Sequence, residues 1–189
     1  SDNTDPIERL FIQWGFSQVF PAKTMCAHVT TWNKNSSVKF RTDVAMMCKL
    51  GFDIKLADMS KDDETYCRTA VQNYNRLKPV VLEGDMYRLV SPYGSNHTST
   101  MYVGKDKDKA VVFAFDIHPR YAEKTLPVRL QGLDADKMYR VKEINLMPGA
   151  NSSLSGNGEV FSGEFLMNVG LNLFTTQQLN SRVIEVVAE

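Results

Sequence analysis

The chain has 189 residues, of which 43% are hydrophobic, and it carries 22 Lys and Arg against 22 Asp and Glu. This composition is typical of an ordinary globular protein and excludes a disordered chain. The balanced charge argues against a nucleic-acid partner, because neutralising phosphates needs a surplus of basic side chains. No run of 18 apolar residues occurs, so the sequence predicts no membrane span.

The three cysteines are Cys26, Cys48 and Cys67. Their odd number and wide spacing argue against a disulfide scaffold and against a structural zinc site. We therefore expect buried thiols in a reducing compartment. The first residues do not read as a signal peptide, and we expect a cytoplasmic or periplasmic protein.

The first part of the chain predicts three helices that alternate with two strands. Residues 4–16 place apolar side chains every three or four positions and carry Pro6 in the first turn, where its missing N–H costs nothing. Ser60 and the acidic residues after it are typical of a helix start. The predicted elements are helices at 4–16, 40–50 and 60–77, strands at 24–30 and 52–56, and Gly51 just after the second helix. This order is typical of parallel βα units, and we expect it to be the last part of a larger parallel sheet, since two strands alone expose their edges.

From Val80 onward the apolar residues alternate with a period of two, which predicts strands. The expected strands are at 85–90, 100–103, 110–117, 126–131, 139–145, 165–173 and 181–187, with turn residues between them. About seven short strands of this kind indicate an antiparallel β-sandwich. The change in composition near Pro79 predicts one domain at 1–78 and a second at 79–189.

Two carboxylates precede the first predicted helix, Asp2 and Asp5. A carboxylate in a loop between a strand and a helix stands where α/β enzymes place their catalytic groups, so this pair contains the best acid/base candidates. A structural interpretation remains open from spacing alone. In it, Asp5 stabilises the start of the helix through the helix dipole and Asp2 is merely solvated.

Several segments share their order and spacing with one family of enzymes. They are SDNTDPIERL at 1–10, TMCAHV at 24–29, RTDVAMM at 41–47 and YRVKEINL at 139–146. Together they resemble glycoside hydrolase family 36, the bacterial-type α-galactosidases, over nearly all of the chain but only the C-terminal part of such an enzyme. The resemblance implies the last βα units of a TIM (β/α)8 barrel followed by an antiparallel β-sandwich domain. Since such a barrel alone takes about 250 residues, we expect the chain to be a fragment.

The resemblance also implies a function and a catalytic residue. The parent enzyme would be a retaining α-galactosidase that releases terminal α-linked galactose from oligosaccharides of the raffinose and melibiose kind, without a metal or an organic cofactor. Asp2 falls on the family's general acid/base. The family's nucleophilic aspartate, in a KWDxN-type segment, has no counterpart in this sequence, and retaining hydrolysis needs two carboxylates. We therefore expect the chain alone to be inactive, and the full-length protein to be a homo-oligomer that binds galactose-containing oligosaccharides.

Three further residues allow two interpretations each. Cys26 and Cys48 stand where the family commonly has glycine, and Cys26 shares a strand face with His28, so a Cys–His pair is conceivable beside the commoner small buried side chain. His28 is a weak candidate for substrate binding, and its ring could instead be satisfied by a backbone carbonyl. We expect His97, like His118, to lie at the surface.

The alternative function is a non-catalytic carbohydrate-binding or oligomerisation module. Tyr87, Tyr93, Tyr102 and Tyr121 could stack against sugar rings if they were exposed side by side. Aromatic residues on strands belong more often to the core or to sheet packing. We expect the sandwich to brace the barrel instead.

Overall fold

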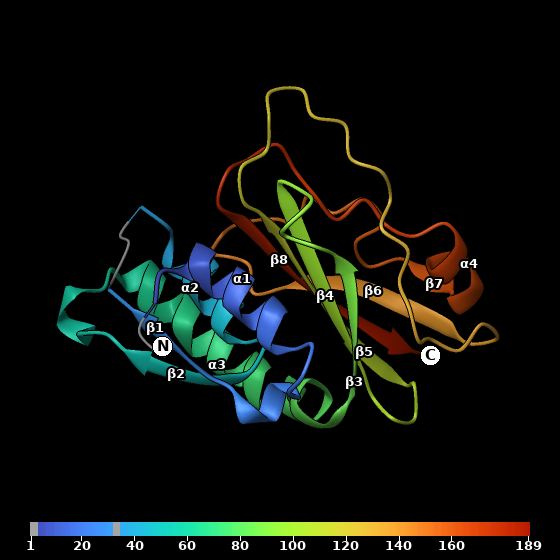
Figure 1. Ribbon diagram of the computed structural model, residues 1–189, viewed down its shortest axis with the longest axis horizontal. Coiled ribbons are helices and arrows are strands. Elements are labelled where there is room, and N and C mark those ends of the chain that lie inside the picture. Colours follow the sequence, from blue (N-terminus) through green and yellow to red (C-terminus); the bar gives the residue numbers. More distant parts are fainter. Residues whose placement is uncertain (1–3, 32–34) are drawn as a thin grey trace.

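A computed structural model describes residues 4–31 and 35–189. Parallel βα units come first and an antiparallel β domain follows them, so the expected fold class is confirmed (Figure 1). The change from helix to antiparallel strand falls between Glu83 and Asp85. A domain boundary at residues 78 and 79 stays a prediction.

The first part of the chain consists of three α-helices, two strands and two short 3-10 turns. They are α1 (Pro6–Phe16), η1 (Ala22–Thr24), β1 (Cys26–Thr30), α2 (Val38–Ala45), β2 (Lys49–Asp53), η2 (Leu56–Asp58) and α3 (Lys61–Glu83). The strands β1 and β2 pair in parallel, from Cys26 opposite Lys49 to Thr30 opposite Asp53. Each α-helix begins at a side chain that accepts from a backbone N–H of the first turn: Asp5, Ser37 and Ser60. The predicted cap at Ser60 is thus confirmed.

Two helix ends differ from the prediction. The helix α2 ends at Ala45 and not at residue 50, because the chain turns through Met46–Cys48, whose buried apolar side chains prolong the helical pattern without helical backbone. As a result Gly51 lies inside β2 and not after a helix. The helix α3 continues past residue 77 through the exposed Pro79, since the next residues, Val80 and Val81, are buried against the core.

The second part of the chain is a six-stranded antiparallel sheet in the order β3-β4-β5-β8-β6-β7. Its elements are β3 (Asp85–Val90), β4 (His97–Val103), β5 (Lys109–Asp116), β6 (Met138–Ile144), β7 (Val160–Ser162), α4 (Gly163–Asn168) and β8 (Asn180–Ala188). Two expected strands are wrong. Residues 126–131 contribute only a single bridge, from Val128 to Leu171, and the region 165–173 begins in the helix α4, capped by Ser162, and continues as a loop.

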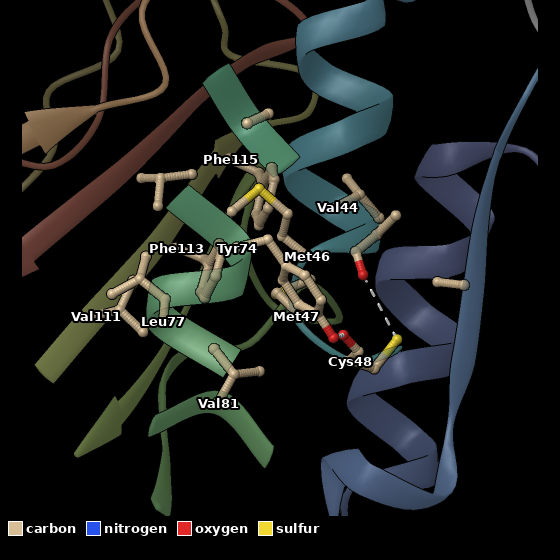
Figure 2. Packing of buried hydrophobic residues seen from close by; sticks show 14 of the residues in the cluster. Val44, Met46, Met47, Cys48, Tyr74, Leu77, Val81, Val111, Phe113 and Phe115 are labelled. Atoms are coloured by element: carbon tan, nitrogen blue, oxygen red, sulfur yellow. Dashed lines mark hydrogen bonds between the residues drawn. The ribbon is translucent and has the colours of Figure 1, made fainter. Parts of the chain in front are cut away.

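Both faces of this sheet are buried. One face packs on α2 and α3, so that the two parts of the chain share a core (Figure 2). This shared core includes Val44, Met46, Tyr74, Leu77, Val81, Val111, Phe113 and Phe115. The other face is covered by irregular segments and α4, which contribute Val128, Leu130, Leu133, Leu154, Leu166, Leu171 and Leu173. The outer layer of the β domain is therefore formed mainly by loops.

A buried carboxylate joins α2 to the antiparallel sheet. Asp43 is fully buried and accepts hydrogen bonds from four side chains: Tyr66 Oη (2.7 Å), Ser181 Oγ (2.7 Å), Asn145 Nδ2 (3.0 Å) and Lys39 Nζ (2.6 Å). Burial, together with the negative charge of Asp43, raises the pKa of Tyr66 well above its usual value, which keeps the phenol a donor. This network fixes the helix that follows β1.

Candidate active site

The carboxyl ends of the two parallel strands lie side by side at Thr30 and Asp53. Enzymes built on parallel sheets place their ligands at this edge. A small cavity at the end of β1 is lined by Thr4, Pro6, Arg9, His28, Thr30 and Arg41, so the start of α1 meets the end of β1 here. We call this region the candidate active site. Its volume of about 10 Å³ has room for about one water molecule and not for a sugar ring.

The structure describes one of the two predicted carboxylates, Asp5. Asp2 lies outside the residues that the structure describes, and its role stays a prediction. Asp5 is the N-cap of α1, and its Oδ1 accepts from the backbone N–H of Ile7 (2.8 Å) and of Glu8 (3.3 Å). Of the two interpretations, the structural one therefore describes Asp5, which holds the start of the helix that follows Asp2 in the chain.

Two arginines line the cavity, and the sequence reasoning assigned neither of them a role. Arg9 is buried, with 5% of its surface exposed. Arg41 is half-buried and donates through Nη1 to the carbonyl of Thr30 and through Nε to that of Ser37. Burial lowers the pKa of Arg41, and the charge of Asp63 opposes this effect. Guanidinium groups stay charged in proteins, so this pair provides positive charge where an anion would be stabilised.

The imidazole of His28 lies half-buried on β1, directly opposite Gly51 of β2. A Cβ at Gly51 would come within 2.1 Å of His28 Cδ2 and 2.6 Å of Nε2, so the ring fills the space beside the glycine. The structure thus brings His28 into the lining of the candidate active site. A contact between His28 and substrate stays a prediction.

The cysteines differ sharply in their surroundings. Cys48 is buried, accepts from Gln13 Nε2 (3.4 Å) and donates to the carbonyl of Ala45 (3.7 Å); burial raises its pKa to about 12, which makes it a poor nucleophile. Burial also raises the pKa of Cys67. The expected burial is wrong for Cys26, which is exposed at the amino end of β1, about 13 Å along the strand from Thr30. The geometry therefore gives no support to a Cys–His catalytic pair at this edge.

The remaining sequence candidates lie in the antiparallel part. Tyr102 is buried and donates to the carbonyl of Met47, and Tyr87 is half-buried, whereas Tyr93 and Tyr121 are exposed on loops. The expected surface position is wrong for His97, which is 2% exposed, because its ring pairs with the buried carboxylate of Asp116.

Neither a metal site nor a membrane helix is found among residues 4–31 and 35–189. No group of three or more His, Cys, Asp and Glu side chains in these ranges is arranged to hold a metal ion. Nor does any helix in the same ranges have the length and apolar character needed to span a membrane.

Two models of known protein families match the chain and together show the family to which it belongs. The Melibiase family matches residues 1–84, and the glycosyl hydrolase family 36 C-terminal domain matches residues 97–186. The chain belongs to glycoside hydrolase family 36. The two matched regions correspond to the parallel βα part and to the antiparallel part of this family 36 chain.

Relatives with known names agree with this assignment. Alpha-galactosidase 2 of Hypocrea jecorina is 34% identical over 97% of the family 36 chain, and alpha-galactosidase 1 of Pediococcus pentosaceus is 30% identical over 90% of it. The chain spans about a quarter of the length of these relatives, 24% and 22% respectively. Because fungal enzymes are among them, the comparisons do not support a specifically bacterial type.

Solved structures give the same picture. The alpha-galactosidase AgaB from Geobacillus stearothermophilus superposes with a TM-score of 0.86 at 28% identity, over 100% of this chain and 25% of that one. Two variants of AgaA from the same organism, described as complexes with raffinose and with stachyose, superpose with TM-scores of 0.86 and 0.87 at 27% and 29% identity. Each of the two is also covered to 25% of its length by the whole of this chain.

Proposed function

We propose that the chain is the C-terminal part of a retaining α-galactosidase in which Asp2 is the general acid/base. One observation carries this proposal: Thr4 and Asp5, the described residues of the segment that resembles the family's acid/base motif, lead into α1 beside a cavity that two arginines line at the carboxyl end of β1. Asp2 would protonate the departing glycosidic oxygen. As a carboxylate it would then take a proton from the water that cleaves the galactosyl-enzyme.

The proposed substrates are oligosaccharides that end in α-linked galactose, of the raffinose and melibiose kind. The complexes of similar enzymes with raffinose and stachyose support this choice. The full-length protein is proposed to act as a homo-oligomer in the cytoplasm or the periplasm. The chain by itself is proposed to be inactive, since no segment of it resembles the family's nucleophile motif.

The test is hydrolysis of raffinose and of an aryl α-galactoside by the full-length gene product, its Asp2→Asn variant, and the chain alone. We expect activity in the full-length protein and a loss of about 10²- to 10⁴-fold on raffinose in the variant. Azide should restore turnover of the aryl galactoside in the variant, because azide attacks the galactosyl-enzyme without a base. Asp5→Asn, which keeps an acceptor at the helix start, is the matched control and should keep its activity.

Four results would contradict parts of the proposal. Inactivity of the full-length protein on both substrates refutes the enzyme function, and activity of the chain alone refutes its incompleteness. Galactose released first as the β-anomer, seen by NMR, refutes retention. Full activity of the Asp2→Asn variant refutes the acid/base role.

A second candidate function is non-catalytic carbohydrate binding by the antiparallel part. It is supported by the exposed rings of Tyr93 and Tyr121, although neither lies on a sheet face. Calorimetric titration of the chain with raffinose tests it. Binding that is lost in both Tyr93→Ala and Tyr121→Ala would favour this function, and absence of binding would exclude it for this sugar.

A further inference from the structure

The buried imidazole of His97, the first residue of β4, is held by a carboxylate on the neighbouring strand. Its Nδ1 lies 2.8 Å from Asp116 Oδ1, and 3% of its side chain is exposed. Asp116 also accepts from the backbone N–H and hydroxyl of Thr175 and from the amide of Asn180. A carboxylate with this many donors acts as an acceptor towards the ring as well, so Nδ1 carries a proton.

The other ring nitrogen faces a second carboxylate. His97 Nε2 is buried, has no hydrogen-bond partner in the described part of the chain, and lies 3.7 Å from Glu123 Oε2. Glu123 belongs to the long segment between β5 and β6 and is held by the backbone N–H of Arg120 (2.7 Å) and by Asn96 Nδ2 (3.2 Å). The hydrogen bond from Arg120 is the main cause that lowers the pKa of Glu123, so this side chain is an anion at neutral pH.

Whether the contact between His97 Nε2 and the Glu123 carboxylate is attractive or repulsive therefore depends on whether Nε2 carries a proton. A neutral ring that is protonated at Nδ1 turns the lone pair of Nε2 towards the carboxylate, which is unfavourable. A charged ring turns an N–H towards it and forms a charge-assisted pair between the buried ring and the partly exposed carboxylate. Imidazole changes between these forms in the range of pH 5 to 8.

We propose that His97, clamped by Asp116, is a proton-operated latch: through Glu123 it holds segment 118–127 against the antiparallel sheet when the ring is charged and releases it when the ring is neutral. Figure 1 shows the segment as part of the yellow loop at the top, between β5 and β6. It carries two exposed apolar side chains, Tyr121 and Leu126. The latch controls whether these side chains are held in place or move with the released segment. The latch is independent of the galactosidase proposal.

The other groups around His97 do not replace Glu123 in this role. The ring of Phe174 packs on the imidazole with centroids 4.6 Å apart, and β3 contributes the apolar Leu89 and Val90 to the groove beside it. The cations of Lys124 and Arg129 line the same groove. Apart from Asp116, Glu123 is thus the charged group that forms an ion pair with a protonated His97.

Hydrogen exchange of the backbone amides in 118–127 tests the latch on the intact chain. Protection factors, corrected for the intrinsic effect of pH on exchange, are compared at pH 5.5 and pH 8.0. We expect protection to fall about fivefold at the higher pH in the natural sequence. The fall should disappear in Glu123→Gln, which keeps an acceptor for Arg120 without the charge, and in His97→Gln. His118→Gln, at an exposed histidine in the same segment, is the matched control and should retain the fall.

The results that overturn the latch are distinct. Equal protection of the natural sequence at both pH values would refute it, as would a fall that persists in Glu123→Gln. A fall in protection that is lost in His118→Gln would assign the effect of pH to His118 and not to His97, and it would refute the latch. If His97→Gln does not fold, as judged by circular dichroism, Glu123→Gln still decides, because Glu123 lies on a loop at the surface.

Discussion

The imidazole of His28 occupies the place that a side chain at Gly51 would take. The parallel register of β1 and β2 sets the two residues opposite each other, and a Cβ on Gly51 would lie 2.1 Å from His28 Cδ2. Real Cβ atoms do not approach another atom so closely. The glycine at this position therefore determines how the ring lies beside the candidate active site.

Replacing Gly51 by alanine should force the His28 ring to move. We expect Gly51→Ala to lower the free energy of unfolding by about 1 to 3 kcal/mol, the usual cost of overpacking, as measured by urea denaturation. In a His28→Ala background the same change should cost much less. Gly94→Ala is the matched control, since a Cβ there meets nothing within 4 Å, and it should change stability by less than about 0.5 kcal/mol. An equal cost of Gly51→Ala in both backgrounds would disprove the steric relationship.

The buried carboxylate of Asp43 should be the most sensitive polar position in the described chain. Asp43→Ala leaves the donors of Tyr66, Ser181 and Asn145 without their acceptor, and we expect a loss of about 3 to 5 kcal/mol in the free energy of unfolding. Tyr66→Phe removes the hydrogen bonds of the phenol to Asp43 and to the carbonyl of Lys39, and it should cost about 1 to 3 kcal/mol. A cost of Asp43→Ala no larger than that of Tyr66→Phe would show that the network contributes little.

The strand pattern of the antiparallel part could be predicted from the sequence where alternation and burial agree. Residues 85–90 form β3 as expected, and the expected strands at 110–117, 139–145 and 181–187 correspond to β5, β6 and β8 within one residue at each end. The region 165–173 fails because its apolar residues belong to a helix and to the loop after it. Ser162 caps that helix, Glu164 stands in its first turn, and Gly170 adopts a positive φ of 88° just beyond its end. These three residues indicate a helix with an end near residue 169, but the apolar residues of 165–173 taken alone indicate a strand.

The candidate active site could be predicted only in part. The carboxylates before α1 and the strand that carries His28 follow from the order of predicted elements. The contributions of Arg9 and Arg41 depend on how the start of α1, the end of β1 and α2 converge, which no local pattern specifies. The burial of His97 depends likewise on the pairing of β4 with β5, which sets it opposite Asp116.

The capping role of Asp5 gives a prediction that separates structure from catalysis. Asp5→Ala removes the acceptor for the N–H groups of Ile7 and Glu8, and we expect the free energy of unfolding to fall by about 1 kcal/mol. Asp5→Asn should change stability much less, because its side-chain oxygen also caps helices. Thermal unfolding followed by circular dichroism measures both. Equal destabilisation by the two variants would show that the charge of Asp5, and not its hydrogen bonds, stabilises the helix.

The raised pKa of Cys48 predicts a loss of stability in alkali. The thiol has a pKa of about 12 in the folded chain, whereas an unfolded cysteine has a pKa of about 8.5, so between these values the folded chain keeps a proton that the unfolded chain releases. Its contribution to stability is therefore complete below about pH 8.5 and is lost progressively as the pH rises towards 12. From pH 8.5 to 10 the free energy of unfolding should fall, with Cys48 contributing at most about 1.4 kcal/mol per pH unit. For each protein, the free energy of unfolding is compared with the value of the same protein at pH 7, so that the packing lost in Cys48→Ala does not enter the comparison. Cys48→Ala should show a smaller fall with pH than the natural sequence. The same slope in both proteins, measured by urea denaturation at each pH, would show that Cys48 does not hold its proton in the folded state.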